Sequence, residues 1–232
     1  MAFCPQAPAL VPDVGRGADA ELAEVRAACR AAIGRVASLG TSVVIVGAGE
    51  QNAVFGPTSR GSFAGFGVDL TVPLGSEDDG PVELPPSLAV GAWLVRAALG
   101  PNSGATGVAT VGGIETTLER HGEQPIALVV IGDGSARRTE KAPGYLDERA
   151  ERFDAAISAA LSTGDPTGLR TEPTTAVALL AAGAPAWAAV SRALAAANDR
   201  WDAELLYDGA PLGVGYLVAA WTAPSPKPGD RG

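Results

Sequence analysis

The sequence is poor in the residues that build disulfide scaffolds, metal centres and membrane spans. Its 232 residues include two cysteines and one histidine. Two cysteines are too few for a disulfide scaffold and fit a reduced, cytoplasmic location. A single histidine excludes the usual zinc and iron sites, which need two or three imidazoles or thiolates. No apolar run approaches the ~20 residues that cross a bilayer, so we expect no membrane partner.

Positive charge is also scarce. The formal net charge is −9, and no extended Lys/Arg patch with interleaved aromatic residues occurs. Because proteins bind phosphate backbones by neutralising charge, this composition argues against a nucleic-acid partner. Arg137, Arg138 and Lys141 form a local exception in an acidic chain.

Hydrophobic residues are abundant and periodic. They make up 47% of the chain, enough for a sizeable core. Their spacing predicts helices over 19–39, with Asp19 as the cap, and over 87–100, 146–161, 174–182 and 185–198. Strands are predicted over 41–47, 68–74, 107–113, 125–131, 203–211 and 214–222, with a long loop after 47. We expect a single α/β domain over 1–223 and a disordered tail over 224–232.

The alternation of strands and helices predicts a layered sandwich. A central, mostly parallel or mixed sheet would carry helices on both faces. Ligands of such sheets bind outside the carboxyl ends of the strands. This rule brings the loops 47–51 and 132–138 to one rim.

The second of these loops is part of a densely charged segment, GDGSARRTEKAPGYLDE (132–148), which follows the predicted strand 125–131. Arginines in such a loop suit bidentate capture of a carboxylate or phosphate. They suit equally well the fixing of the loop by pairing with Asp133 and Asp208. The residues alone leave both interpretations open. No complete dinucleotide-binding, P-loop or serine-nucleophile motif is present.

Four segments together resemble the class III extradiol ring-cleavage dioxygenases, in particular subunit-B-like proteins. They are AFCPQAPALVPDVG (2–15), VVIVGAGEQNAVFG (43–56), VVIGDGSARRT (129–139) and LLYDGAPLGVGYLVA (205–219). Their order spans nearly the whole chain. The resemblance implies an extradiol dioxygenase subunit-B-like sandwich fold.

The metal-binding residues of that family are replaced. Two histidines and a glutamate hold Fe(II) in the family, and another histidine acts as acid and base. Here Gln6 stands at the first histidine, Ala48 or Gly49 at the second and Ala136 at the third, while Asp208 stands at the glutamate. We therefore expect a protein with no metal, no cofactor and no ring-cleavage activity, and we assign no catalytic residue.

The resulting hypothesis is that the former active-site cleft binds a small anionic molecule. The candidate ligand-binding residues are Gln6, Ala48, Glu50, Gln51, Asp133, Ser135, Arg137, Arg138, Tyr207 and Asp208. Two alternatives remain open. One is an enzyme of different chemistry that uses Asp133, Asp208 and Tyr207, and the other is a non-catalytic structural or interaction protein that forms homo-oligomers.

Overall fold

The computed structural model of the protein describes residues 1–39, 42–49, 53–75, 79–100, 108–111, 114, 118, 122, 124–195 and 201–223. In this part of the chain the main sheet has seven strands in the order β3-β6-β2-β7-β1-β9-β8. The strands are β1 (Ala2–Cys4), β2 (Ser42–Gly47), β3 (Ala53–Phe55), β6 (Val108–Val111), β7 (Ile126–Ile131), β8 (Asp202–Gly209) and β9 (Tyr216–Thr222).

The middle of the sheet is parallel and its margins are antiparallel. Strands β6, β2, β7 and β1 run in the same direction, whereas β3 on one side and β9 and β8 on the other are antiparallel to their neighbours. The carboxyl ends of β1, β7 and β2 therefore lie at one edge of the sheet, and the loops that follow them are neighbours.

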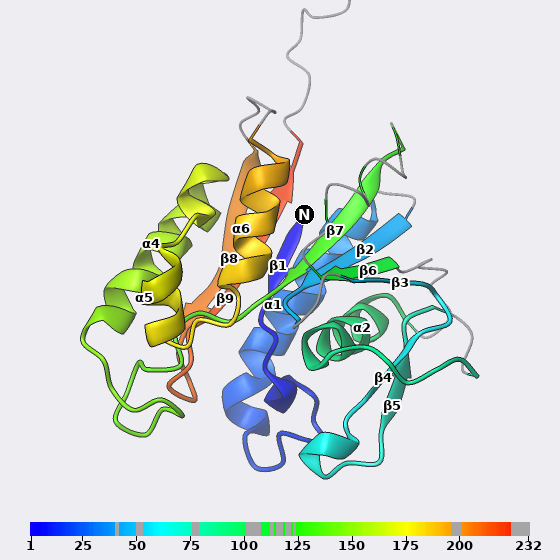
Figure 1. Cartoon of the computed structure of the whole chain (residues 1–232), viewed down its shortest axis with the longest axis horizontal. Helices are drawn as coiled ribbons and strands as arrows, with labels where there is room; N and C mark the ends of the chain where they lie inside the picture. Colours follow the sequence, from blue (N-terminus) through cyan, green and yellow to red (C-terminus); the bar gives the residue numbers. More distant parts are fainter. Residues whose placement is uncertain are drawn as a thin grey trace, which may run out of the picture.

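Helices cover both faces of the sheet (Figure 1). Helices α1 (Asp19–Ala37) and α2 (Pro86–Leu99) pack on one face, and α4 (Arg149–Thr163) and α6 (Ala184–Ala193) pack on the other. The short helix α5 (Pro173–Ala178) precedes α6. The predicted mixed α/β sandwich is confirmed at this level.

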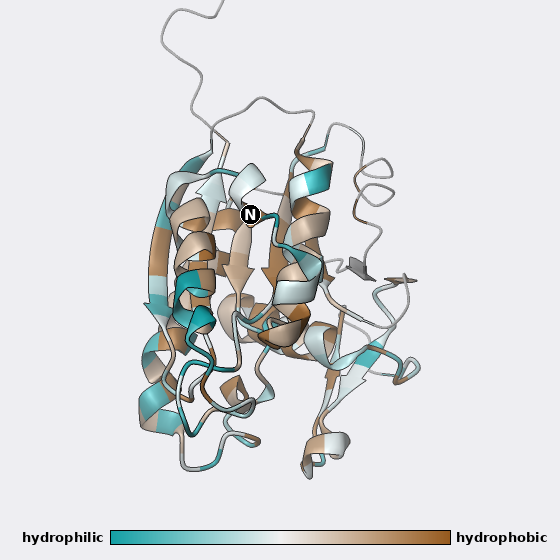
Figure 2. Cartoon of the chain, turned by 60° about the vertical axis from the view of Figure 1, so that its left-hand side comes forward, coloured by the Kyte–Doolittle hydropathy of each residue, from teal (hydrophilic) through white to brown (hydrophobic). Residues whose placement is uncertain are grey.

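Strand alternation explains the two hydrophobic layers. Val43 and Ile45 of β2 join the cluster beneath α1 and α2, whereas Val44 and Val46 join the cluster beneath α4 and α6. Successive side chains of a strand point to opposite faces, so a strand covered on both sides is apolar throughout. In Figure 2 the central strands are largely brown and the teal segments lie mainly at the periphery.

Several predicted boundaries need correction. The long loop after 47 contains β3 and β4 (Arg60–Ser62), and β4 pairs with β5 (Thr71–Pro73) in a separate two-stranded sheet. The predicted strand 68–74 is therefore not part of the main sheet. Helix α1 is preceded by Ala18, which makes no side-chain cap, so Asp19 lies in the first turn and does not cap the helix.

Three short 3₁₀ helices complete the described elements: η1 (Pro8–Leu10), η2 (Ala64–Phe66) and η3 (Thr167–Leu169). Strand β1 was not among the strands predicted from spacing, and β9 begins at Tyr216 and not at 214. Helix α4 begins at Arg149 and not at 146, α5 ends at Ala178 and not at 182, and α6 ends at Ala193 and not at 198. The predicted tail, 224–232, lies outside the described residues. None of the described helices is long and apolar enough to cross a bilayer.

Candidate functional site

A buried carboxyl group lies at the carboxyl edge of the parallel strands. Asp133 follows β7 and is 8% exposed. The backbone amide of Gln6, which follows β1, donates a hydrogen bond to Asp133 Oδ1 at 2.8 Å. Burial raises the pKa of Asp133 to about 7, although hydrogen bonds from the amides of Gln6 and Ala7 act in the opposite direction. Asp133 therefore exists in both protonation states near neutral pH.

Asp133 lines a pocket of about 350 Å³ that is otherwise mostly apolar; we call it the Asp133 pocket. Tyr216, at the start of β9, also lines this pocket and is 2% exposed. Burial raises the pKa of the Tyr216 phenol, and the charge of Asp133 raises it further. The remaining walls come from Ala7, Pro8, Ala9, Ala136, Pro143, Leu180, Ala182, Leu212 and Val214. The pocket thus offers one carboxyl and one phenol group inside an apolar enclosure.

A second buried aspartate, Asp154 of α4, has a different environment. Its Oδ2 accepts a hydrogen bond from Arg138 Nη1 at 2.9 Å, and its Oδ1 accepts one from the Ser135 backbone amide at 2.7 Å. The Asp154 side chain is 1% exposed. Burial raises the pKa of Asp154, and the bonds from Ser135 and Arg138 oppose that shift. This ion pair ties the loop after β7 to helix α4.

Glycine residues allow the backbone to approach the Asp154 carboxylate. A Cβ atom placed on Gly215 would lie 2.1 Å from Asp154 Oδ2, and one on Gly134 would lie 2.5 Å from Asp154 Oδ1. The two glycines also bind each other, because the Gly134 amide donates to the Gly215 carbonyl at 2.7 Å. The glycines therefore form part of the enclosure around Asp154.

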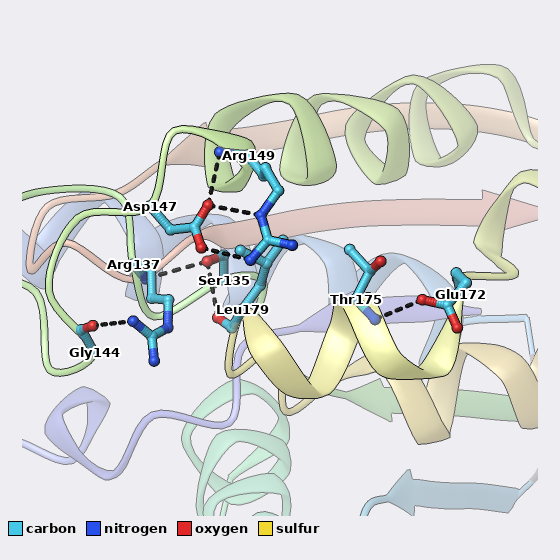
Figure 3. Close-up of polar contacts among 8 residues, drawn as sticks. All are labelled: Ser135, Arg137, Gly144, Asp147, Arg149, Glu172, Thr175 and Leu179. Atoms are coloured by element: carbon cyan, nitrogen blue, oxygen red, sulfur yellow. Dashed lines mark hydrogen bonds and ion pairs between the residues drawn. The ribbon is translucent and has the colours of Figure 1, made fainter.

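The densely charged segment 132–148, which we call the charged loop, is held by hydrogen bonds within itself and to the end of α5 (Figure 3). Ser135 Oγ donates to the Leu179 carbonyl at 2.9 Å and accepts from the Arg137 amide at 3.1 Å. Arg137 Nη1 donates to the Gly144 carbonyl at 2.5 Å. Arg137 Nε is buried and has no partner among the described residues. Neither Arg137 nor Arg138 lines the Asp133 pocket.

The loop continues into α4 through an exposed ion pair. Asp147 accepts hydrogen bonds from the Arg149 side chain through both of its oxygens (Figure 3). This pairing lowers the pKa of Asp147 to about 2. The charges that made this segment conspicuous are therefore used largely within the protein.

The other predicted site residues are only partly brought together. Gln6 and Asp133 are in contact, and Ser135 is next to Asp154. The carbonyl of Ala48 accepts a hydrogen bond from Ser87 Oγ of α2, and Ala48 does not line the pocket. Glu50 and Gln51 lie outside the described residues.

Tyr207 and Asp208 lie on opposite faces of β8. Tyr207 packs against the hydrophobic cluster on the α1–α2 face, whereas Asp208 Oδ2 accepts a hydrogen bond from Ser158 of α4 at 2.5 Å. Neighbouring residues of a strand point in opposite directions, so they cannot act as one pair. Neither residue lines the Asp133 pocket.

Asp154 and Tyr216 are the two important residues that sequence reasoning missed. Asp154 falls four residues after Ala150 and three before Ile157, within the apolar face of the predicted helix. A charged residue on that face signals a buried partner. Tyr216 follows the glycines of GVGY, in the segment 205–219 that carries part of the family resemblance.

Among the described residues, no group of three or more His, Cys, Asp or Glu side chains is arranged to hold a metal ion. Comparison of the chain with protein-family models and with curated proteins finds no match. The resemblance to extradiol dioxygenases, and the absence of bound metal expected from it, therefore stay predictions.

Proposed function

We propose that the chain binds a small molecule in the Asp133 pocket and that this molecule presents a hydroxyl group to Asp133. The observation that carries the proposal is a buried carboxyl of pKa about 7 in an apolar pocket at the carboxyl ends of parallel strands. Ligands of α/β sheets bind at such edges, and strongly shifted pKa values are concentrated at functional sites.

The state of Asp133 selects the ligand chemistry. An ionised carboxyl group only accepts hydrogen bonds, whereas a protonated one also donates. A hydroxyl group can donate and accept, so it pairs with either form. An anion would meet repulsion from the ionised form, and Arg138, which could offset it, is paired with Asp154 and does not line the pocket. These contacts favour a hydroxyl ligand over the anion suggested by the loop's charges.

We also propose that the chain is a diverged, metal-free relative of the extradiol dioxygenases and has no ring-cleavage activity. Three of the four segments that carry the resemblance contribute walls to the Asp133 pocket: 2–15 through Ala7, 129–139 through Ala136 and 205–219 through Val214. If the proposal is correct, protocatechuate with added Fe(II) gives no oxygen uptake above an iron-only control. Uptake above that control contradicts it.

Ligand-observed NMR with cyclohexanol tests the binding site. Methylcyclohexane replaces the hydroxyl by a methyl group, and cyclohexanecarboxylate supplies the anion. At pH 8, where Asp133 is mostly ionised, we expect cyclohexanol to bind best. A hydrogen bond to a charged group exceeds a neutral one by about 1 kcal/mol, so Asp133→Asn should weaken cyclohexanol binding roughly fivefold.

The same experiment at pH 5.5 provides an internal check. Wild-type Asp133 is then largely protonated, so the difference between the wild type and Asp133→Asn should nearly vanish. Asp147→Asn, which changes an exposed carboxyl outside the pocket, should bind like the wild type at both pH values. Tighter binding of the carboxylate than of the alcohol at pH 8 would favour the anion hypothesis instead.

The raised pKa also supports a second candidate, an enzyme that moves a proton between Asp133 and its ligand. General acids and bases work best when their pKa lies near the working pH. Tyr216, which lines the same pocket, is a better candidate partner of Asp133 for this role than the Tyr207 and Asp208 of the sequence hypothesis, which do not line it. Deuterium exchange at the α-carbons of cyclohexanone in D₂O, lost in Asp133→Asn, would support this activity, and no exchange would contradict it.

A further inference from the structure

A second, apolar groove adjoins the Asp133 pocket. It has a volume of about 490 Å³ and lies between α5 and α6; we call it the α5–α6 groove. None of its described wall residues is charged, and most are Ala or Pro, with Thr171, Val177 and Leu180 among the rest. Because most of these side chains are small, the groove is a depression in which apolar surface faces outward.

Two residues belong to both cavities. Leu180 and Ala182, on the turn between α5 and α6, line the α5–α6 groove and also the Asp133 pocket. The two cavities therefore adjoin at this turn, and a molecule that occupies both must lie against Leu180 and Ala182. The carboxyl group lies in one cavity only, so the combined site has one polar end and one apolar end.

Leu180 is held at this junction in an unusual conformation. Its φ angle is 54°, in the left-handed region that non-glycine residues rarely adopt. Its side chain is directed at the charged loop, where a Cβ atom on Gly144 would lie 2.7 Å from Leu180 Cδ1. Even so, Leu180 is 45% exposed, and Val177 in the same groove is 75% exposed. Exposed apolar side chains gathered around a depression indicate a binding surface.

We propose that the ligand is an amphiphile, with its hydroxyl head at Asp133 and a linear alkyl tail in the α5–α6 groove. This inference rests on the proposed function, because the head group occupies the site assigned there. The shared walls at Leu180 and Ala182 carry this inference, because they place the polar pocket and the apolar groove side by side. A second copy of the chain or another protein would cover the groove but would not use the buried carboxyl.

The test is a series of n-alkanols from butanol to decanol, each below its solubility limit, titrated into the full chain. Burial of each methylene stabilises binding by about 0.8 kcal/mol, so affinity should rise about fourfold per added carbon once the tail reaches the groove. Val177→Asp places a charge on the exposed wall of the groove. We expect it to weaken octanol binding at least tenfold and to leave butanol binding unchanged.

Val82→Asp is the matched control, because Val82 is also an exposed valine, at 52%, and lies outside both cavities. It should bind octanol and butanol like the wild type. If affinity does not rise with alkanol length, or if the two substitutions have equal effects, the tail proposal is wrong. The proposed function still stands in that case, provided that butanol binding depends on Asp133. If the wild-type protein does not bind butanol at all, the proposed function itself is wrong. A dimer dissolved by Val177→Asp in sedimentation, with a flat series, would assign the groove to a second copy.

Discussion

Asp133 and Asp154 are both buried aspartates near the same sheet edge, and their surroundings differ in one decisive respect. Asp154 has a guanidinium partner, a backbone amide donor and two glycines that close around it. Asp133 has backbone amide donors and faces a pocket. A buried carboxylate that is paired on all sides supports the structure, whereas one that borders an open volume is available to a ligand.

The comparison also explains the charged loop. Arg138 belongs to the enclosure around Asp154, and among the described residues Asp133 has no ion-pair partner. The loop therefore has two roles: Arg138 holds α4 through Asp154, and Asp133 provides the carboxyl group of the pocket. Four predictions test this division, from the largest expected effect to the smallest.

Removal of the Arg138 guanidinium should have the largest effect on stability. Arg138→Ala leaves the carboxylate of Asp154 buried and unpaired, which costs about 3–5 kcal/mol of stability at pH 7. The cost should be smaller at pH 5, because the orphaned carboxyl can then take up a proton. Urea denaturation measures both values.

The exposed pair of the same loop is the control for this loss. Arg149→Ala removes the partner of Asp147, and solvent replaces it, so the urea midpoint should stay close to that of the wild type. Equal losses for the two variants would mean that Arg138 and Asp154 do not form the proposed support.

Neutralisation of the pocket carboxyl should act in the opposite direction. The unfolded Asp133 ionises near pH 3.8 but the folded one only near 7, so its protonated form contributes stability that is lost as pH rises between these values. Asp133→Asn keeps an acceptor oxygen for Gln6 and escapes this loss. We expect the variant to be more stable than the wild type by about 4 kcal/mol at pH 8.

Melting curves from pH 4 to 8 check the sign of this effect, and the two proteins should converge near pH 4. Asp147 provides the contrast, since its pKa is lowered to about 2. Its contribution is present above pH 4 and is lost as pH falls toward 2. A destabilised Asp133→Asn at pH 8 would mean that the ionised form is stabilised by the fold.

A methyl group added beside the Asp154 carboxylate should lower the stability of the protein. Gly215→Ala places a methyl group against Asp154 Oδ2 and should cost about 1–3 kcal/mol, because the ion pair must shift. Gly34→Ala in α1 is the control, since nothing lies within 4 Å of its added Cβ atom. It should stabilise the helix by about 0.5–1 kcal/mol. Chemical denaturation that ranks the two variants in the reverse order would refute the close approach.

The smallest effect is expected at the hydroxyl group of Ser135. Ser135→Ala removes the bonds to the Leu179 carbonyl and the Arg137 amide but keeps the backbone bond to Asp154, so we expect a loss of about 1 kcal/mol. The carbonyl of Leu179 retains the Ala136 amide at 3.1 Å as a partner. Thermal melts measure the change, and a loss as large as that of Arg138→Ala would place Ser135 at the centre of the support.

Local pattern was enough to predict most elements of this protein. The β-branched runs of β2 and β7 and the periodic faces of α1, α2 and α4 determine buried strands and amphipathic helices by themselves. The strands β3 (AVF) and β4 (RGS) escaped prediction because three residues are too few to show a period. The mixed sheet and its two helical layers follow from the order of the elements, and they were predicted at that level.

The sequence predicted only that a site lies at the carboxyl ends of the parallel strands, and not which side chains form it. The family resemblance placed Gln6 and Asp133 in one cleft, and the two are in contact, but it could not say which way each side chain points. It therefore grouped Tyr207 with Asp208, which β8 sends to opposite faces, and it overlooked Tyr216. The sequence determined which charges enter the loop after β7. Only the tertiary structure decided that Arg138 neutralises Asp154 and leaves Asp133 in an apolar pocket, because burial and pairing depend on residues far apart in the chain.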